Sequence, residues 1–559
     1  MGMSFSKVVG EEDLRKTLRK MDGRRYGAYK KLKRVVLNYD FGEAMLTRIQ
    51  GDPYAPPSVI EVTVPPTSHR IPSRFFDEKC LTPLLDYLAR IAYRRSLRLK
   101  ERCGTGNSGY IGVPRPSPRI IRRSSVDSSG RNLIFRIFIG LPARGRRILG
   151  MKAEELLLWK IPELIRSTLS QRSLDDLEAH VNTYLDQEYV RGWLYENDYV
   201  AFIGDGSILP RESSYSVKPL KNAVPMKAPS GLRARIRLPS GRTIEGMAIP
   251  RGFIVITGGG YHGKTTLLEA IQEGVYDHVR GDGRELAVSR SKTILVKAED
   301  GRLIFHVDVS SFIGDLPGGG RTEDFSSYDA SGSTSMAASI SEAIEAGAEV
   351  LLIDEDTSAT NMLYKDDVMT RIIRREPIKP LCMQGKSMVE RCGIGVIAVA
   401  GASSSLISIA DRVILMESYL PKDVTTSARS MAPPPPKLEE YEPPKRRVFY
   451  GVKGLRKIKV MGFKLVASYD DGGRFELDLS DNPRIVEKAQ AKMIAHVIMS
   501  LRKPADPIFV DELAEHVNES FRDKGFEAFV NPVPPDLASV DGLDVVWALN
   551  RLRNSSFSQ

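Results

Sequence analysis

Apolar positions recur every three to four residues in three stretches of the first 190 residues, and this spacing predicts helices. In the first stretch Leu14, Leu18 and Met21 share one face, and basic residues occupy the others. Residues 82–102 repeat the pattern and become basic in their C-terminal half, and residues 151–190 repeat it again. The first part of the chain is therefore expected to contain several amphipathic helices.

Strand-like patterns lie between and after these helices. Residues 129–143 read as paired strands and end in a basic turn. From residue 230, apolar and polar positions alternate and are punctuated by Gly and Pro, which indicates strands that enter a new domain. Residues 431–447 are charged and Pro-rich, a composition typical of a stiff linker. The expected order is an N-terminal basic α+β domain (1–227), an α/β core (228–430), this linker (431–447) and a small C-terminal α+β domain (448–559).

The composition is that of a globular protein and excludes several classes. Among 559 residues, 42% are hydrophobic and 27% are charged, and we find no run of 18 apolar residues that would predict a transmembrane helix. The first 16 residues lack the apolar core of a secretory signal. Four cysteines without a CxxC pair fit a reducing compartment, and seven scattered histidines show no zinc-ligand spacing. We expect an intracellular, soluble protein, whose true N-terminus and targeting signal stay open.

Charge is distributed unevenly along the chain. Residues 1–150 hold 30 Lys and Arg against 13 Asp and Glu, whereas the remaining 409 residues hold 51 against 57. A basic excess confined to one region indicates a polyanionic partner. The alternative is a solvated basic surface without a specific role, and charge alone does not separate the two.

One glycine-rich stretch, GGGYHGKTTL at 258–267, has the layout of a phosphate-binding loop. It follows an apolar strand and opens a helix, which is the context that the motif requires. Glycines allow backbone N–H groups to surround phosphates, and the helix N-terminus adds partial positive charge. Lys264 is predicted to reach the β- and γ-phosphates, and the Thr265 hydroxyl to bind Mg²⁺. The expected nucleotide-binding residues of this loop are Gly258, Gly259, Gly260, Tyr261, His262, Gly263, Lys264, Thr265 and Thr266.

A second motif, VLLIDED at 350–356, ends an apolar strand with carboxylates. Asp354 is predicted to contact the metal, as in a Walker B strand. Glu355 is the predicted catalytic base, which polarises the attacking water, and Lys264 is predicted to stabilise the charge of the transferred group. The alternative is that the two carboxylates only begin a loop, which the upstream phosphate-binding loop disfavours.

Residues 330–334, ASGST, lie just before this strand and resemble the ABC signature sequence LSGGQ. In that comparison Ser331, Gly332 and Ser333 occupy the Ser-Gly-Gly positions. Because the ABC signature meets ATP bound by the other subunit, the resemblance implies a dimer in which these residues complete the partner's nucleotide site. The alternative is a serine N-cap with a polar first turn. Further on, EDTSATN resembles the ABC D-loop, with Asn361 where Asp is usual.

Together these stretches resemble the predicted ATPases of the ABC class over nearly the whole chain. The segments that carry the resemblance are DGRRYGAYKKLK, QGDPYAPPS, LPARGRRI, GGGYHGKTTLLEAIQEGVYDHVRGDGRE, ASGSTSMAASISEAIEAGAEVLLIDEDTSATNML, EPIKP, IADRVILMESY and ALNRLR. The resemblance implies an ABC-type P-loop ATPase core of α/β fold, ATP, Mg²⁺ and a homodimer. Within the family the chain resembles the kinetoplastid mitochondrial branch associated with RNA editing complexes. That branch implies U-rich RNA and editing-complex proteins as partners, and a mitochondrial rather than a cytoplasmic location.

RNA is expected to meet the chain through basic clusters of the N-terminal domain, because Lys and Arg contacts to phosphate supply most non-specific affinity. Tyr26 and Tyr29 are interleaved with the first cluster and are predicted either to stack on unpaired bases or to edge the core. The candidate RNA-binding residues are Arg24, Arg25, Lys30, Lys31, Lys33, Arg34, Arg94, Arg95, Arg98, Arg144, Arg146 and Arg147, with Lys100, Arg102 and a further cluster of Arg119, Arg122 and Arg123. Each cluster alone also fits a solvated helix face, and the 144–147 cluster also fits contact with a nucleotide phosphate.

Two γ-phosphate sensors that are usual in ABC ATPases are missing from the sequence. Gly401 or Ala402 stands where a histidine is usual, and VDVSSFIGDLP occupies the approximate place of the Q-loop glutamine, so turnover is expected to be slow. The sequence favours an ATPase whose ATP-dependent dimer binds or remodels RNA, in RNA editing or processing. The alternatives are a nucleotide-gated protein scaffold with little hydrolysis, the soluble half of a transporter and a P-loop kinase. The RNA preference, the hydrolysis rate and the partner proteins do not follow from the sequence.

Overall fold

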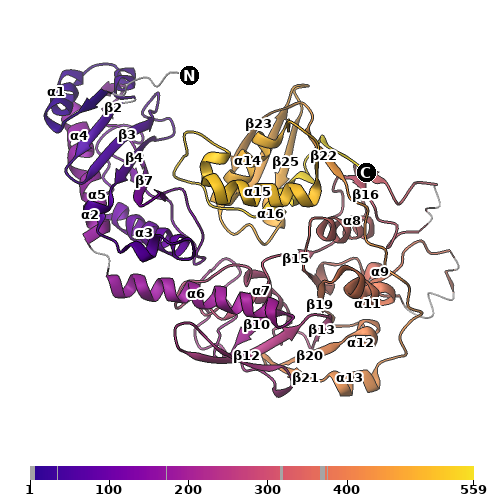
Figure 1. Ribbon diagram of the computed structural model, residues 1–559. Helices are drawn as coiled ribbons and strands as arrows, with labels where there is room; N and C mark the ends of the chain where they lie inside the picture. Colours follow the sequence, from indigo (N-terminus) through magenta and orange to yellow (C-terminus); the bar gives the residue numbers. More distant parts are fainter. Residues whose placement is uncertain are drawn as a thin grey trace. The chain divides into compact units, whose positions relative to one another are not determined.

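The computed structural model describes residues 7–33, 35–170, 173–314, 316, 319–365, 372–373 and 375–559 (Figure 1). The chain forms two compact units. Unit 1 consists of residues 1–185 and 524–539, and unit 2 consists of residues 186–523 and 540–559.

Unit 1 is built on a seven-stranded sheet in the order β1-β2-β3-β4-β7-β5, in which β6 also pairs with β7. The β1–β2 pair is parallel and the other pairs are antiparallel. The strands are β1 (Lys7–Val9), β2 (Val35–Tyr39), β3 (Gly42–Arg48), β4 (Ser58–Val64), β5 (Ile111–Gly112), β6 (Val126–Ser129) and β7 (Asn132–Ile139), followed by a short hairpin of β8 (Ala143–Arg144) and β9 (Arg147–Ile148).

Helices form in unit 1 where the apolar spacing predicts them. The first, α1 (Glu11–Met21), buries Leu14, Leu18 and Met21, as expected. The predicted 82–102 helix is α3 (Glu78–Leu99), which starts earlier. The stretch 151–190 is divided into α4 (Gly150–Glu155), the π-helical turn η3 (Leu156–Lys160), α5 (Ile161–Ser170) and α6 (Leu174–Glu196), and shorter turns form η1 (Tyr26–Leu32), α2 (Pro66–His69) and η2 (Ser73–Phe76).

The centre of unit 2 is a six-stranded sheet in the order β15-β18-β19-β13-β20-β21. The first five strands are parallel, and only β21 is antiparallel. One face packs against α8 and α11, and the other packs against α7 and a second sheet, so the central strands are apolar on both sides. The elements are β13 (Phe253–Thr257), α7 (Lys264–Glu273), β15 (Thr293–Val296), α8 (Gly332–Glu345), β18 (Val350–Asp354), η5 (Glu355–Thr357), α9 (Thr360–Leu363), α11 (Leu381–Cys392), β19 (Gly395–Val399), α12 (Ser405–Ile409), β20 (Arg412–Glu417), β21 (Leu420–Asp423) and α13 (Thr425–Met431).

The second sheet of unit 2 is antiparallel, in the order β11-β12-β10-β14. Its strands are β10 (Tyr199–Gly204), β11 (Arg233–Arg237), β12 (Thr243–Pro250) and β14 (Ala287–Ser289), with η4 (Ser230–Leu232) before β11 and a separate hairpin of β16 (Ile304–Val307) and β17 (Phe325–Ser327). β10 precedes residue 228 but pairs with both β12 and β14. Unit 2 therefore begins well before the boundary that we expected at 227/228, because pairing to distant strands fixes this segment.

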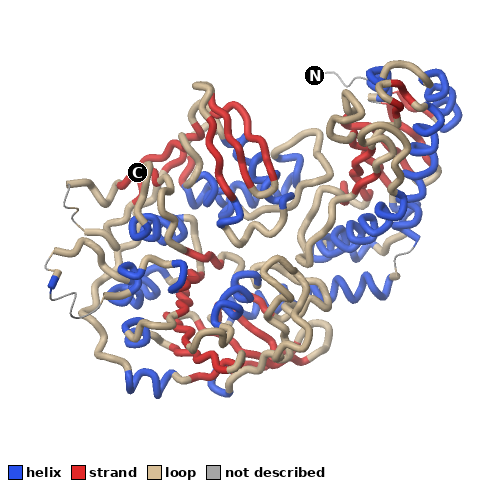
Figure 2. Tube along the Cα trace, turned by 180° about the vertical axis from the view of Figure 1, so that it is seen from behind, coloured by secondary structure: helices blue, strands red, loops and turns tan. Residues whose placement is uncertain are grey.

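The last part of the chain adds two three-stranded sheets and three helices to unit 2 (Figure 2). Its elements are β22 (Val448–Val452), β23 (Leu455–Met461), β24 (Lys464–Tyr469), β25 (Arg474–Asp478), η6 (Leu479–Asp481), α14 (Lys488–Leu501), β26 (Ile508–Phe509), α15 (Val510–Lys524), η7 (Gly525–Ala528), α16 (Gly542–Leu549) and β27 (Ser555–Ser558). The 524–539 segment departs from the expected C-terminal domain and belongs to unit 1, where the backbone N–H of Ser124 donates to the carbonyl of Leu537 (3.0 Å).

The Pro-rich segment is not a free spacer at its C-terminal end. Tyr441 is fully buried, with its ring 5.6 Å from that of Phe312. Arg447 is also buried, and its guanidinium pairs with Glu345 of α8 at 2.7 Å. Residues 441–447 therefore pack against the core of unit 2, because one aromatic ring and one ion pair anchor them.

Candidate active site

The phosphate-binding loop joins the C-terminal end of β13 to α7, as the motif predicts. Gly258 has a φ of +143°, and a Cβ atom there would lie 2.4 Å from the carbonyl oxygen of Met416 in β20. Only glycine therefore allows the loop to leave the sheet so close to its neighbour. Gly263, with a φ of +93°, precedes the first helical residue, Lys264.

Lys264 spans the loop that precedes it. Its Nζ donates to the carbonyl oxygens of Gly258 (2.8 Å) and Gly259 (2.9 Å). The neighbouring Thr265 is exposed in the first turn of α7. This turn thus presents a cation, a hydroxyl and the N-terminus of a helix, which are the features that the predicted phosphate-binding role requires.

Asp354 ends β18, where parallel pairing aligns it with Val399 at the end of β19. Its side chain is buried, burial raises its pKa, and its Oδ1 accepts from the backbone N–H of Asp356 (3.2 Å). Among the described residues no cluster of three or more His, Cys, Asp or Glu side chains forms a metal cage. One carboxylate and one hydroxyl nevertheless suit Mg²⁺, which takes few protein ligands and fills its shell with phosphate oxygens and water.

Glu355 is held by the loop that follows β19. Its Oε2 accepts hydrogen bonds from the backbone N–H groups of Gly401 (2.5 Å) and Ala402 (3.0 Å). A Cβ atom at Gly401 would lie 3.7 Å from this oxygen and 3.9 Å from Nζ of Lys264. The predicted base, the predicted lysine and the backbone at the place of the usual histidine therefore lie together.

The signature-like stretch caps α8. The Ser331 hydroxyl accepts from the backbone N–H of Thr334 (3.4 Å), which is the N-cap geometry. Ser333 donates to Oδ1 of Asn361 (2.8 Å), so the signature-like and D-loop-like segments are bonded to each other within one chain. Ser331 is exposed and Ser333 is half-buried.

Comparison with known protein families accounts for almost the whole chain. Residues 173–449 match the P-loop domain of the ABC ATPases, and residues 11–172 match the N-terminal domain described for ATPases of the ABC class. The chain belongs to the ABC-class ATPase family. Residues 466–558 match the MRB1590 C-terminal domain. The resemblance drawn from the motifs is thereby confirmed, and so is the P-loop α/β core with a domain on each side.

Individual relatives of this ABC-class ATPase match over part of their length. An uncharacterized protein of Methanocaldococcus jannaschii is 31% identical over 260 residues, which cover 44% of this chain and 57% of that protein. A bacterial Atm1-family ABC exporter solved with ATP bound is 13% identical and has a TM-score of 0.22, over 50% of this chain and 49% of the exporter. Within the described ranges, none of the helices is both long and apolar enough to span a bilayer.

Two tyrosines lie at the nucleotide loop of this ABC-class ATPase: Tyr261, which belongs to the predicted loop, and Tyr419, for which the sequence predicted no role. Tyr261, at the tip of the loop, is 98% exposed and has a φ of +63°. Tyr419, in the β20–β21 hairpin, has a φ of +69°, and its ring would lie 3.3 Å from a Cβ atom at Gly263. The hairpin is bonded to the loop, since the Ser418 N–H donates to Nδ1 of His262 (3.0 Å). Bulky residues rarely adopt left-handed backbone conformations, and such strain concentrates at functional sites.

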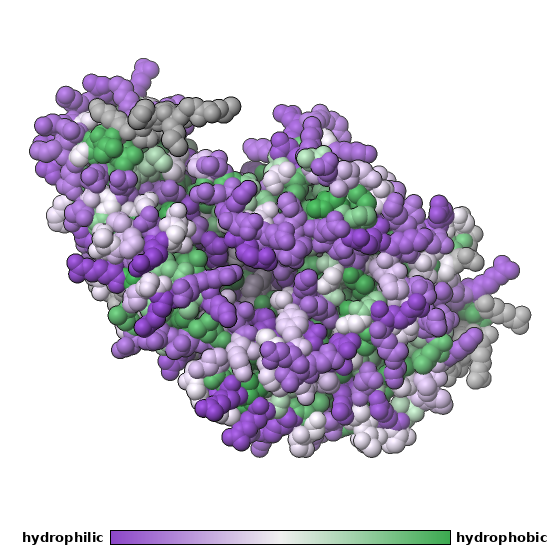
Figure 3. All heavy atoms as spheres, in the orientation of Figure 1, coloured by the Kyte–Doolittle hydropathy of each residue, from purple (hydrophilic) through white to green (hydrophobic). Residues whose placement is uncertain are grey.

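Two basic clusters that are separate in the sequence form one surface in unit 1. Arg25 and Arg147 form a β-bridge, and Nη1 of Arg147 donates to the carbonyl of Gly23 (3.0 Å). All members of this surface, which we call the arginine surface, are exposed: Arg24, Arg25, Arg144, Arg146 and Arg147. Hydrophilic side chains cover most of the visible face of unit 1 (Figure 3). Tyr54, 70% exposed, lies beside the arginine surface, because its N–H donates to Asp52, which pairs with Arg146 (2.9 Å).

The other predicted RNA contacts are placed less uniformly. Lys30, Lys31 and Lys33 are exposed at and just after η1, and Arg94 and Arg98 are exposed on α3, where Arg95 is half-buried. Arg34 lies outside the described residues. The three lysines continue from the arginine surface, because Arg25 is the N-cap of η1, and the α3 arginines are likewise compatible with contact to a large polyanion.

Of the two roles left open for Tyr26 and Tyr29, the structure supports a place in the core rather than stacking on bases. Both rings are buried, and their hydroxyls donate to the carbonyls of Leu141 (3.1 Å) and Pro142 (2.7 Å). Burial raises the pKa of both hydroxyls. Their neighbours in sequence are basic and exposed, but the two rings point inward and hold η1 against the segment that leads into the β8–β9 hairpin.

The further basic cluster of Arg119, Arg122 and Arg123 also has a mainly structural role. Arg119 and Arg123 are buried, and Arg123 pairs with Asp86 of α3. Arg122 pairs with Asp127 at 2.8 Å. The guanidinium groups of Arg122 and Arg123 are thus paired with carboxylates inside unit 1, and the side chain of Arg119 is covered. We therefore do not expect these three arginines to contact RNA.

Proposed function

We propose that this ABC-class ATPase hydrolyses ATP and that its ATP-dependent dimer binds or remodels RNA. The observation that carries the proposal is the arginine surface: two clusters, far apart in the sequence, are bonded into one exposed basic area. Unit 2 of the same chain supplies the nucleotide loop and carboxylates of an ATPase. A nucleotide site and a polyanion surface in one chain support nucleotide-controlled binding of nucleic acid.

In the hydrolytic half of the proposal, each predicted residue has one task. Lys264 neutralises charge on the β- and γ-phosphates, and Glu355 accepts the proton of the attacking water. Thr265 and Asp354 hold Mg²⁺, which neutralises phosphate charge when bound. The N–H groups of Gly401 and Ala402 orient the Glu355 carboxylate, a task that needs no histidine side chain. Gly258 to Thr266 surround the triphosphate.

The dimer in this proposal is completed by α8. Ser331, Gly332 and Ser333 contact ATP bound by a second copy, and Asn361 holds Ser333 in position for that contact. The exposed Ser331 and the Ser333–Asn361 bond support this arrangement. Closure of the dimer on ATP and its opening after hydrolysis then change the spacing of two arginine surfaces.

In the RNA half, arginines bind phosphates and an aromatic ring stacks on a base. Single-stranded nucleic acid is usually bound by such a combination, with modest sequence preference. Tyr54 is the exposed ring beside the arginine surface. U-rich RNA, editing-complex proteins and a mitochondrial setting are the partners and location that the family branch implies, and the match to the MRB1590 C-terminal domain supports that branch.

A salt series of filter binding to a U-rich single-stranded RNA tests the RNA half. We compare wild type with a triple variant, Arg24→Ala, Arg25→Ala and Arg144→Ala, and with a control, Arg235→Ala and Arg237→Ala, in the exposed face of β11. Each lost phosphate contact reduces the magnitude of the slope of log affinity against log salt by about 0.7. The slope of the triple variant should therefore be smaller than that of wild type by about 2. The control should match wild type. A flat, weak response of wild type, with and without ATP, refutes RNA binding.

A second candidate is a nucleotide-gated protein scaffold with negligible turnover. The observation that favours it is the absence, at Gly401, of a side chain that reaches toward the γ-phosphate. In that case ATP binding closes the dimer, and the function of the closed dimer is to bind other proteins. Phosphate release that is the same in wild type and Glu355→Gln would support the scaffold over the ATPase.

A further inference from the structure

The strand β15 connects the Walker B strand with the C-terminal part of unit 2. It pairs in parallel with β18, and the loop that follows, residues 298–302, continues beside the site. In this loop the backbone N–H of Ala298 donates to the carbonyl of Thr357 (3.0 Å), two residues after Glu355. The 298–302 loop is therefore bonded directly to the turn that carries the predicted base.

The same loop is bonded to the start of α8. The backbone N–H of Glu299 donates to the hydroxyl of Ser335 in the first turn of the helix (2.8 Å). The N–H of Gly301 donates to the carbonyl of Ala330 (2.8 Å), the residue just before Ser331. A movement of the 298–302 loop would thus move both the Walker B turn and the signature-like helix start.

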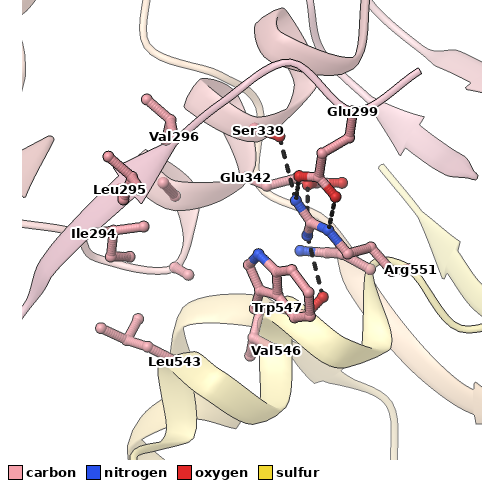
Figure 4. Close-up of a pocket in the computed structure, with 13 residues that line it drawn as sticks. Ile294, Leu295, Val296, Glu299, Ser339, Glu342, Leu543, Val546, Trp547 and Arg551 are labelled. Carbon is pink, nitrogen blue, oxygen red and sulfur yellow. Dashed lines mark hydrogen bonds and ion pairs between the residues drawn. The ribbon is translucent and has the colours of Figure 1, made fainter. Parts of the chain in front are cut away.

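Arg551, two residues beyond α16, holds this loop from the C-terminal side (Figure 4). Its Nε and Nη2 donate to the two carboxylate oxygens of Glu299, at 2.9 and 2.6 Å. The guanidinium is buried, lies 4.1 Å from the ring centre of Trp547 and donates to Ser339 of α8 (3.3 Å). Burial acts to raise the pKa of Glu299, but the Arg551 charge outweighs it and lowers the pKa to about 2. The pair is therefore charged at neutral pH.

The surroundings of Arg551 have spare bonding capacity. Oε2 of Glu342 in α8 lies 2.7 Å from Nη2 of Arg302 but 3.8 Å from Nη1 of Arg551. Within the described part of the chain, Oε1 of Glu342 and both Nε and Nη1 of Arg302 lack hydrogen-bond partners. A cavity of about 30 Å³ lies among β15, α8 and α16 (Figure 4). Glu342 therefore offers the Arg551 guanidinium a second buried carboxylate close to its bond with Glu299.

We propose that Arg551 is a positioning residue that couples the C-terminal part of unit 2 to the nucleotide site through Glu299 and the 298–302 loop. The proposal rests on ATP binding and hydrolysis as proposed above. When nucleotide shifts the Walker B turn and the start of α8, the bidentate Arg551–Glu299 pair transmits the shift to α16. Conversely, any partner that displaces α16 alters turnover.

Trp547 provides a reporter of this coupling, because its ring stacks on Arg551 and the chain has only 3 tryptophans. A parent protein with Trp159→Phe and Trp193→Phe leaves Trp547 as the single indole. We expect the fluorescence emission of Trp547 in this parent protein to change when ATP and Mg²⁺ are added. This measurement needs no substitution at Arg551. An emission that does not respond, in a parent that binds ATP, overturns the coupling.

The second measurement compares Arg551→Lys in this parent with Arg553→Lys as the matched control. Lysine keeps the charge but cannot form the bidentate pair. Arg553 is on the same segment, is partly exposed and pairs with Asp471 instead. We expect Arg551→Lys to lower kcat about 3- to 10-fold with little change in KM, and to abolish the ATP response of Trp547, while Arg553→Lys changes neither.

The outcomes separate the coupling from the proposed function. Normal kcat and a normal Trp547 response in Arg551→Lys, with an unchanged circular dichroism spectrum, overturn the coupling alone. A parent protein that neither binds nor hydrolyses ATP overturns the proposed function, and the coupling with it. If Arg551→Lys does not fold, the response of the parent protein decides.

Discussion

The carboxylate of Glu355 accepts a hydrogen bond from the backbone N–H of Gly401 at 2.5 Å. Glu355 follows β18 and Gly401 lies two residues beyond β19, so two neighbouring parallel strands deliver them to the same edge of the sheet. A backbone donor needs no particular side chain. The position that usually carries a histidine in ABC ATPases can therefore be glycine and still orient the predicted base.

Replacement of Glu355 by Gln tests its role as the catalytic base. Glutamine keeps the size of the side chain but accepts no proton, so we expect phosphate release to fall by about 10²- to 10⁴-fold while ATP binding is retained. Asp356→Asn, an exposed neighbour, is the control and should behave as wild type. Phosphate release that persists in Glu355→Gln would contradict the assignment.

Two glycines of the nucleotide loop should respond differently to alanine. At Gly258 the added Cβ meets the Met416 carbonyl at 2.4 Å, whereas at Gly260 nothing lies within 4 Å. We expect Gly258→Ala to abolish ATP binding and to lower the free energy of unfolding by about 1–3 kcal/mol. Gly260→Ala should be tolerated. Urea unfolding and a fluorescent-nucleotide titration measure both effects, and equal behaviour of the two variants would refute the steric argument.

Removal of the Tyr29 hydroxyl should affect stability but not RNA binding. Tyr29→Phe loses the 2.7 Å bond to Pro142 and leaves that buried carbonyl without this donor, so we expect a loss of about 1 kcal/mol. Tyr54→Ala should instead weaken RNA binding by about 1–3 kcal/mol and leave stability unchanged. Urea unfolding gives the free energy of unfolding of each variant, and filter binding gives its RNA affinity. An RNA defect in Tyr29→Phe would restore the stacking role that the structure removes.

Asp86 should make unit 1 sensitive to acid. The carboxylate is fully buried and accepts from Arg90 (2.7 Å), Arg123 and Nε2 of His180 (3.0 Å). Burial acts to raise its pKa, but the charges of Arg90 and Arg123 outweigh burial and lower it from 3.8 to about 2. A lowered pKa contributes stability that is present above pH 3.8 and is lost as the pH falls toward 2.

This shift corresponds to about 2–3 kcal/mol of the free energy of unfolding. Asp86→Asn should be less stable at neutral pH, because its cationic neighbours lose their partner, and should lack this part of the pH dependence. Urea unfolding of both proteins between pH 2 and 6 measures the difference. Parallel curves for the two proteins would show that Asp86 is not the titrating group.

The nucleotide motifs were predictable because their chemistry depends on residues that are close in the chain. Gly258 to Thr265 form one continuous turn, and the apolar run before Asp354 is itself the buried strand. Helix α1 was predictable for the same reason, since its apolar spacing is local. The candidate RNA-binding residues were not predictable in the same way. Charge and aromatic content do not show which side chains of a turn are buried and which are exposed.

The sequence by itself determined the P-loop core and the basic character of the N-terminal region, and it predicted which loop residues bind nucleotide, because local spacing and composition encode each of these features. Only the tertiary structure decided that Tyr26 and Tyr29 face inward, that the two arginine clusters join, and that Arg551 meets Glu299 across 252 residues. The physical reason is that burial and ion pairing depend on which distant segments pack together. A single carboxylate or carbonyl more than 100 residues away can commit a side chain that looks free in the sequence.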